Sequence, residues 1–181
     1  TCSNGVSTVS QIKVNSIVPA GGLPSGSNGG IIQVKSVTKT DTFSTSNASY
    51  TDITGLSVTI TPSSNASKIF ITGHMTGMGT SNTRQGFRLM RDSTPICRGD
   101  ANGNRDRNFG GIYSSDNDNT TQTVSVCHLD DPGTTSAVTY KIQTINSNNT
   151  DAVYVNRSNS WTDSSSHNTG TSNITVMEVS G

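Results

Sequence analysis

Residues 121–129 read TQTVSVCHL, and their side chains alternate between two faces of an extended chain. Val124 and Val126 point to one face, and Cys127 and Leu129 point to the other. A period of two residues is typical of a β-strand that turns one face toward a core. Branched residues such as Val and Thr also favour a pleated sheet over a helix. The stretch therefore predicts a strand.

Similar short runs recur on both sides of this strand, and turn-forming residues separate them. Spacings of this kind between short strands are typical of a sandwich or barrel, and no window shows a convincing helical period. We predict an all-β fold, an antiparallel β-sandwich of jelly-roll-like form. The other predicted strands are residues 31–38, 50–61, 68–75, 86–91, 95–99, 109–114, 137–145, 152–158 and 171–179.

The first thirty residues differ from the rest in composition and in the spacing of their apolar residues. QIKVNSIV, residues 11–18, has the pattern of a short strand or extended arm, and PAGGLPSGSNGG, residues 19–30, is rich in residues that interrupt regular structure. We therefore divide the chain into an N-terminal arm and linker, residues 1–30, and a β-sandwich domain, residues 31–181.

The composition excludes some classes of partner. Lys and Arg number 12 and Asp and Glu number 12, so no net charge attracts nucleic acid or an anionic membrane. Only 29% of the residues are hydrophobic, which implies a thin core and favours an oligomer. No run is long enough for a membrane span, and we see no secretory signal. Cys97 and Cys127 lie in strand-like runs, where we expect small buried side chains.

The acids and bases do not form a recognisable catalytic motif. The three histidines are far apart in the sequence, and the paired aspartates lie in turn-like segments, where such residues usually bond to the backbone. We expect no enzyme and no cofactor. The residues considered are His74, His128, His167, Asp116, Asp118, Asp130 and Asp131.

Six of the 12 cationic residues are arginines between Arg84 and Arg107. Within this segment, residues 100–106 place oxygen-bearing side chains at alternate positions, as calcium loops do. However, Arg105 stands where such a loop needs glycine, and Gly111 stands where it needs its last acid. We therefore predict a hairpin with a polar turn and no metal.

Asp92, Asp100 and Asp106 interrupt the arginines, so the segment does not resemble a basic groove for nucleic acid. We expect the arginines to pair with nearby aspartates or with a neighbouring subunit. The candidates for a subunit interface are Arg88, Arg105 and Arg107.

Surface recognition remains as a function for the loops. Trp161 lies in a long polar loop, residues 156–170, and an exposed indole beside amides and carboxylates suits a sugar. A tryptophan that caps the end of the sandwich explains the same residue, and the sequence does not choose between the two. The candidates for contact with a host surface or glycan are Trp161, Asp163, Tyr113, Asp116, Asn117, Asp118 and Arg84.

Several stretches of the chain resemble bacteriophage fibre and virion-surface proteins, which are frequent in phages of cyanobacteria and other marine bacteria. They are KVNSIVPAGGLPSG at residues 13–26, IIQVKSVTKTDTFSTSNASYTDITGLSVTITPSSNASKIFITG at 31–73, GFRLMRDSTPICRGD at 86–100 and TSNITVMEVSG at 171–181. The resemblance implies a homotrimer on the virion surface, assembled in the cytoplasm of the host bacterium. It supplies no catalytic residue.

In such a protein the N-terminal arm attaches to another virion protein, and we expect Ile12, Val14 and Ile17 to take part. The outward loops would bind a bacterial surface receptor, a glycan in our first hypothesis. The alternative is a structural head-fibre, decoration or tail-collar protein whose loops bind other virion subunits. Nucleic acid and membrane insertion are not expected.

Overall fold

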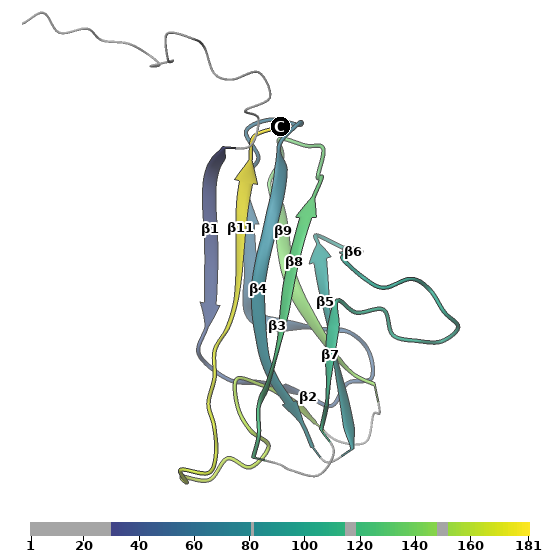
Figure 1. The fold of residues 1–181 in the computed structure, drawn as a ribbon, viewed down its shortest axis with the longest axis vertical. Coiled ribbons are helices and arrows are strands. Elements are labelled where there is room, and N and C mark those ends of the chain that lie inside the picture. Colours follow the sequence, from purple (N-terminus) through teal and green to yellow (C-terminus); the bar gives the residue numbers. More distant parts are fainter. Residues whose placement is uncertain (1–29, 81, 115–118, 148–151) are drawn as a thin grey trace, which may run out of the picture.

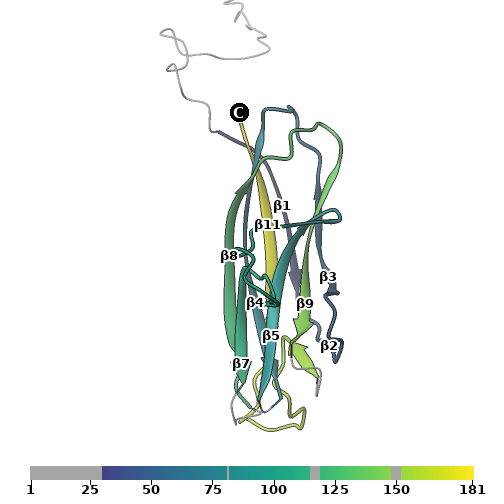
Figure 2. The same ribbon diagram turned by 90° about the vertical axis from the view of Figure 1, so that its right-hand side faces the viewer.

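The computed structural model describes residues 30–80, 82–114, 119–147 and 152–181, and every regular element in them is a β-strand (Figure 1). The strands form two antiparallel sheets that pack face to face (Figure 2). Sheet A holds β1 (Ile31–Lys39), β2 (Phe43–Thr45), β4 (Lys68–Gly79), β8 (Gln122–Asp130), β10 (Val153–Val155) and β11 (Ser172–Val179). Sheet B holds β3 (Thr51–Ile60), β5 (Thr83–Arg91), β6 (Thr94–Ile96), β7 (Gly110–Ser114) and β9 (Val138–Asn146).

The connectivity is that of a jelly roll. Without the three-residue strands β2, β6 and β10, the order is β1-β11-β4-β8 in sheet A and β3-β9-β5-β7 in sheet B. Numbered from 1 to 8 along the chain, these strands run 1-8-3-6 and 2-7-4-5, the order that two interlocked Greek keys produce. The predicted antiparallel sandwich is therefore confirmed.

The ten predicted strands are all present, with ends shifted by up to a few residues. β2 was not predicted, because its three residues are too few to show an alternating pattern. The prediction of buried cysteines was wrong. Cys127 is exposed because it shares the outward face of β8 with Leu129, and Cys97 is only half-buried just after β6.

The core lies between the two sheets and takes alternate residues from each strand. On β3, for example, Leu56, Val58 and Ile60 are buried and the residues between them are exposed. From sheet A, Ile71 and Val176 meet them and are fully buried. Burial of each such side chain contributes about 1.5–3 kcal/mol, so this alternation is what holds the sheets together.

The start of β1 and the end of β11 lie at one end of the sandwich, the terminal end. The amide of Ser180 donates a hydrogen bond to the carbonyl of Gly30 over 3.0 Å there. The long loop 156–170 lies at the opposite end, the loop end (Figure 1). Within the described ranges there is no helix long and apolar enough to cross a membrane.

Candidate functional site

The loop between β10 and β11 is held by a short neck. Backbone hydrogen bonds join Ser158 to Asn168 and Gly170 to Asn156, each over 3.1 Å. Asn156 is buried and has a positive φ of 63°, a conformation that asparagine tolerates better than most residues.

The Asn156 side chain fixes the neck to the sandwich. Its amide donates to the carbonyls of Lys39 and Asp41 over 2.8 and 2.9 Å, and its oxygen accepts from the Ser172 hydroxyl over 2.7 Å. Because these partners come from β1, its following turn and β11, the loop projects from a rigid base. Sequence reasoning did not identify Asn156.

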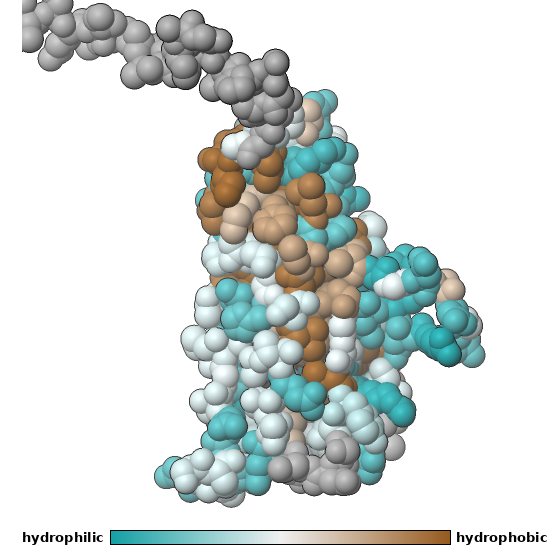
Figure 3. Space-filling view, in the orientation of Figure 1, coloured by the Kyte–Doolittle hydropathy of each residue, from teal (hydrophilic) through white to brown (hydrophobic). Residues whose placement is uncertain are grey.

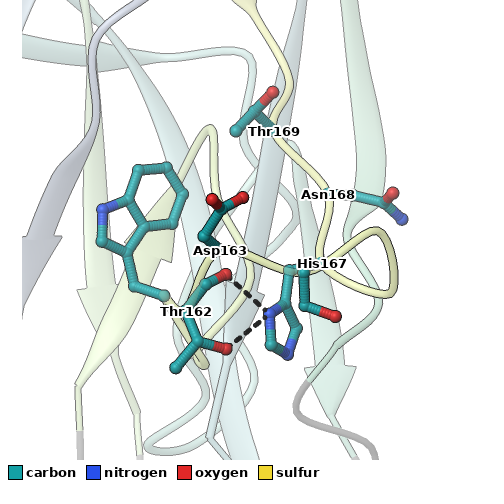
Figure 4. A pocket seen from close by; sticks show the side chains of 7 residues that line it. Thr162, Asp163, His167, Asn168 and Thr169 are labelled. Atoms are coloured by element: carbon teal, nitrogen blue, oxygen red, sulfur yellow. Dashed lines mark hydrogen bonds between the residues drawn. The ribbon is translucent and has the colours of Figure 1, made fainter.

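The loop encloses an open cleft of about 330 Å³. Trp161 is 55% exposed at this cleft, so it does not cap the core. The His167 ring is directed at Thr162, whose hydroxyl and carbonyl both lie 3.0 Å from Nδ1 (Figure 4). The other lining residues are Asp163, Ser164, Asn168 and Thr169. Trp161 and Asp163, two of the candidates for contact with a glycan, thus line one cleft.

Arg157 supports the indole from within the loop. Its guanidinium carbon lies 4.0 Å from the centre of the Tyr154 ring and 5.3 Å from that of Trp161. Such cation–π contacts contribute about 0.5–2 kcal/mol each. The exposed indole is therefore held by a contact within its own loop.

A second cleft, of about 480 Å³, lies on the outer face of sheet B and contains Arg84, Tyr113 and Arg105. Arg84 and Tyr113 are register partners on β5 and β7, and the guanidinium carbon lies 5.5 Å from the ring centre. Arg84, which lies before the predicted strand 86–91, belongs to β5, and Tyr113 belongs to β7, within the predicted strand 109–114. The structure separates this pair from the Trp161 cleft and joins it to Arg105, which was predicted at a subunit interface.

The floor of this second cleft depends on Gly86. A Cβ at this position would collide with the side chain of Asn108, so glycine lets the asparagine lie across β5. Asn108 in turn accepts a hydrogen bond from the Tyr50 hydroxyl over 2.8 Å. Arg107 donates to the carbonyl of Gly99 over 2.6 Å and so closes its own loop.

Arg88, the third interface candidate, belongs to a polar ladder on the outer face of sheet B. Its guanidinium lies 3.5 Å from the centre of the Tyr50 ring and donates to Gln143 over 2.6 Å. Gln143 and Lys141 both donate to Asp52 over 2.7 Å. Burial would raise the pKa of Asp52, but these two hydrogen bonds lower it below its usual value.

Within the described ranges, Arg91 does not form an ion pair with Asp92, the aspartate beside it in the sequence. Arg91 instead forms an ion pair with Asp130 of β8 over 3.0 Å. Across the described ranges, no group of three or more His, Cys, Asp or Glu residues could hold a metal. Six predicted contact residues lie outside the described residues: Ile12, Val14, Ile17, Asp116, Asn117 and Asp118.

Comparison with known proteins gives likeness to solved structures but no sequence family. No family model matches the chain, and no curated protein matches it. Among solved structures that match is the "Structure of infectious bursal disease virus Gx strain", with 12% sequence identity and a TM-score of 0.45. The match covers 83% of this chain and 33% of that one, so the chain spans about a third of the length of the viral protein.

Proposed function

We propose that this chain is a phage virion-surface protein whose loop end binds a glycan of the bacterial host, without enzymatic activity. The Trp161 cleft carries the proposal. An exposed indole face can stack on the C–H face of a pyranose. Asp163 can accept hydrogen bonds from sugar hydroxyls, and Asn168 can both accept and donate.

The arrangement of the two ends supports the same role. The described sandwich begins and ends at the terminal end, and the Trp161 loop lies at the far end (Figure 1). A protein attached to a particle through residues 1–30 would therefore present the cleft outward. The resemblance of the sequence to phage fibre proteins is the reason for naming a phage particle and a bacterial host.

Replacement of Trp161 by alanine is expected to weaken binding to host cells by about 10- to 100-fold, because a central aromatic contact is worth about 2 kcal/mol or more. Binding is measured with the full chain on whole cells and on an array of bacterial surface glycans. Trp161→Phe retains a stacking ring and should keep much of the affinity. Tyr113→Ala, in the other cleft, should keep nearly all of it. Unchanged adsorption of a folded Trp161→Ala protein would remove the cleft from the receptor site.

The second candidate function is structural, as a head-fibre, decoration or tail-collar protein. Val34 and Leu129, apolar and exposed on the outer face of sheet A, favour contact with another protein surface. The position of the chain in a reconstruction of the intact virion would separate the two functions. A loop end turned toward other virion subunits would contradict receptor binding.

A further inference from the structure

A row of apolar side chains crosses the outer face of sheet A from edge to edge. Val34, Met177, Phe70 and Leu129 are register partners on β1, β11, β4 and β8. Val34 is 53% exposed and Leu129 is 57% exposed, and the two between them are half-buried. Brown, hydrophobic side chains accordingly gather in the upper part of this face in Figure 3. We call this set the apolar row.

The two rows directly below the apolar row contain no Asp, Glu, Lys or Arg. The next row toward the loop end consists of Ser36, Thr175, Thr72 and Cys127. The row after it begins at Thr38 and ends at Ser125, with Asn173 and His74 between them. On the other side of the apolar row, toward the terminal end, Lys68 forms an ion pair with Asp131.

The outer face of sheet B is different. It carries the ladder of Asp52, Lys141, Gln143 and Arg88, in which charged groups meet water and one another. The centres of protein interfaces are depleted of charged residues, and their rims are polar. The two faces of the sandwich are therefore unequal, and sheet A has the composition of an interface.

We propose that the outer face of sheet A is the surface through which copies of this chain associate with one another. In a pair of copies related by a twofold axis both chains use the same surface, so a charged face would meet like charges. A face that is neutral across three rows avoids this repulsion. Its ion pair at the rim, Lys68 with Asp131, offers both signs of charge to a neighbouring copy. The three rows of this face carry no charge that a strongly charged partner could complement.

The size of the face suits a contact between copies. Four strands about 4.8 Å apart and about eight residues long, at about 3.3 Å per residue, span roughly 500 Å². Two copies would together bury about 1,000 Å², which reaches the lower range for a specific interface. The small Ser and Thr side chains below the apolar row let a second sheet approach closely. This face is a different surface from the one that carries Arg88, Arg105 and Arg107, the candidates for subunit contact named from the sequence.

The test is the mass of the full chain in solution, measured by sedimentation or light scattering over a wide range of concentrations. We expect the wild type to assemble to at least twice the 18.9 kDa of one chain. The double variant Val34→Lys, Leu129→Lys should remain at the mass of one chain. The double variant Ser57→Lys, Thr59→Lys adds the same charge to the exposed outer face of sheet B and should assemble like the wild type.

Cys127 gives a second readout that does not depend on the double variant. Its thiol is exposed on this face in the single chain, so assembly should protect it from a maleimide reagent, and dilution should restore the reaction. Peptide mass analysis separates its labelling from that of the other cysteines. A reactive Cys127 in the assembled protein would overturn the proposal.

A wild-type protein that stays monomeric at every concentration would also overturn the proposal. The face would then be available for contact with a different virion protein. Assembly of the double variant at wild-type strength would have the same consequence. Glycan binding through Trp161 is measured separately, so failure of one proposal does not decide the other.

Discussion

Replacement of Asp130 by alanine is expected to destabilise the fold by about 3–5 kcal/mol. Asp130 is buried at the end of β8, where it accepts a hydrogen bond from the Tyr140 hydroxyl over 2.7 Å and two from Arg91. Tyr140 is fully buried, and its burial, together with the bond to Asp130, raises its pKa above the usual value. Without the carboxylate, a buried hydroxyl and a partly buried guanidinium both lose their partner.

Urea unfolding of the purified variants measures this loss. Asp131→Ala is the matched control, because the neighbouring carboxylate pairs with Lys68 on the surface and should matter much less. Adding Tyr140→Phe to Asp130→Ala should recover part of the stability, since the stranded hydroxyl is then removed. Equal effects of the two aspartate substitutions would show that the buried cluster is not what stabilises this edge.

Glu178 is expected to make the stability depend on pH between about 4.5 and about 2. Its carboxylate is fully buried and accepts hydrogen bonds from the amide of Gln33 and from the hydroxyl and backbone amide of Ser63. Burial alone would raise its pKa, but these bonds outweigh it and lower the pKa to about 2 from 4.5. The charged form is therefore favoured by folding.

Because the folded pKa is the lower one, the stabilisation is complete above the unfolded value of 4.5 and disappears as the pH falls toward 2. The shift corresponds to about 3 kcal/mol. Glu178→Gln should be less stable than the wild type by about that amount at neutral pH, and the two should converge near pH 2. Asp100→Asn, at an exposed loop position, serves as the control. A difference that stays constant from neutral to acid pH would contradict this role for Glu178.

The fold could be predicted because each long strand shows its alternation of buried and exposed residues within its own short stretch of sequence. In β8 the alternation of Val126 with Cys127 and Leu129 shows directly which side chains face the core. The chemical identity of Cys127 suggested burial, but its position in the alternation decides that it is exposed. β2 could not be predicted, since its three residues become a strand only through pairing with β10.

The site could be predicted only in part, because its supports are distant in the sequence. The polar loop around Trp161 suggested a sugar cleft. The residue that holds this loop, Asn156, bonds to Asp41 and Lys39, which precede it in the sequence by 115 and 117 positions. The arginines gave a misleading local signal for the same reason. Arg91 reaches past Asp92 to Asp130, and Arg84 meets Tyr113 only because β5 and β7 pair in that register.

The placement of the two ends also determines how the protein responds to mechanical load. If residues 1–30 hold the particle and the loop end holds a cell, tension enters at the start of β1 and runs along the strands. The register of β1 with β11, from Ile31 with Val179 to Lys39 with Ser172, is then loaded in shear. The hydrogen bonds of this ladder resist together instead of opening one after another. The jelly roll therefore loads the hydrogen bonds between β1 and β11 together along the line of the pull.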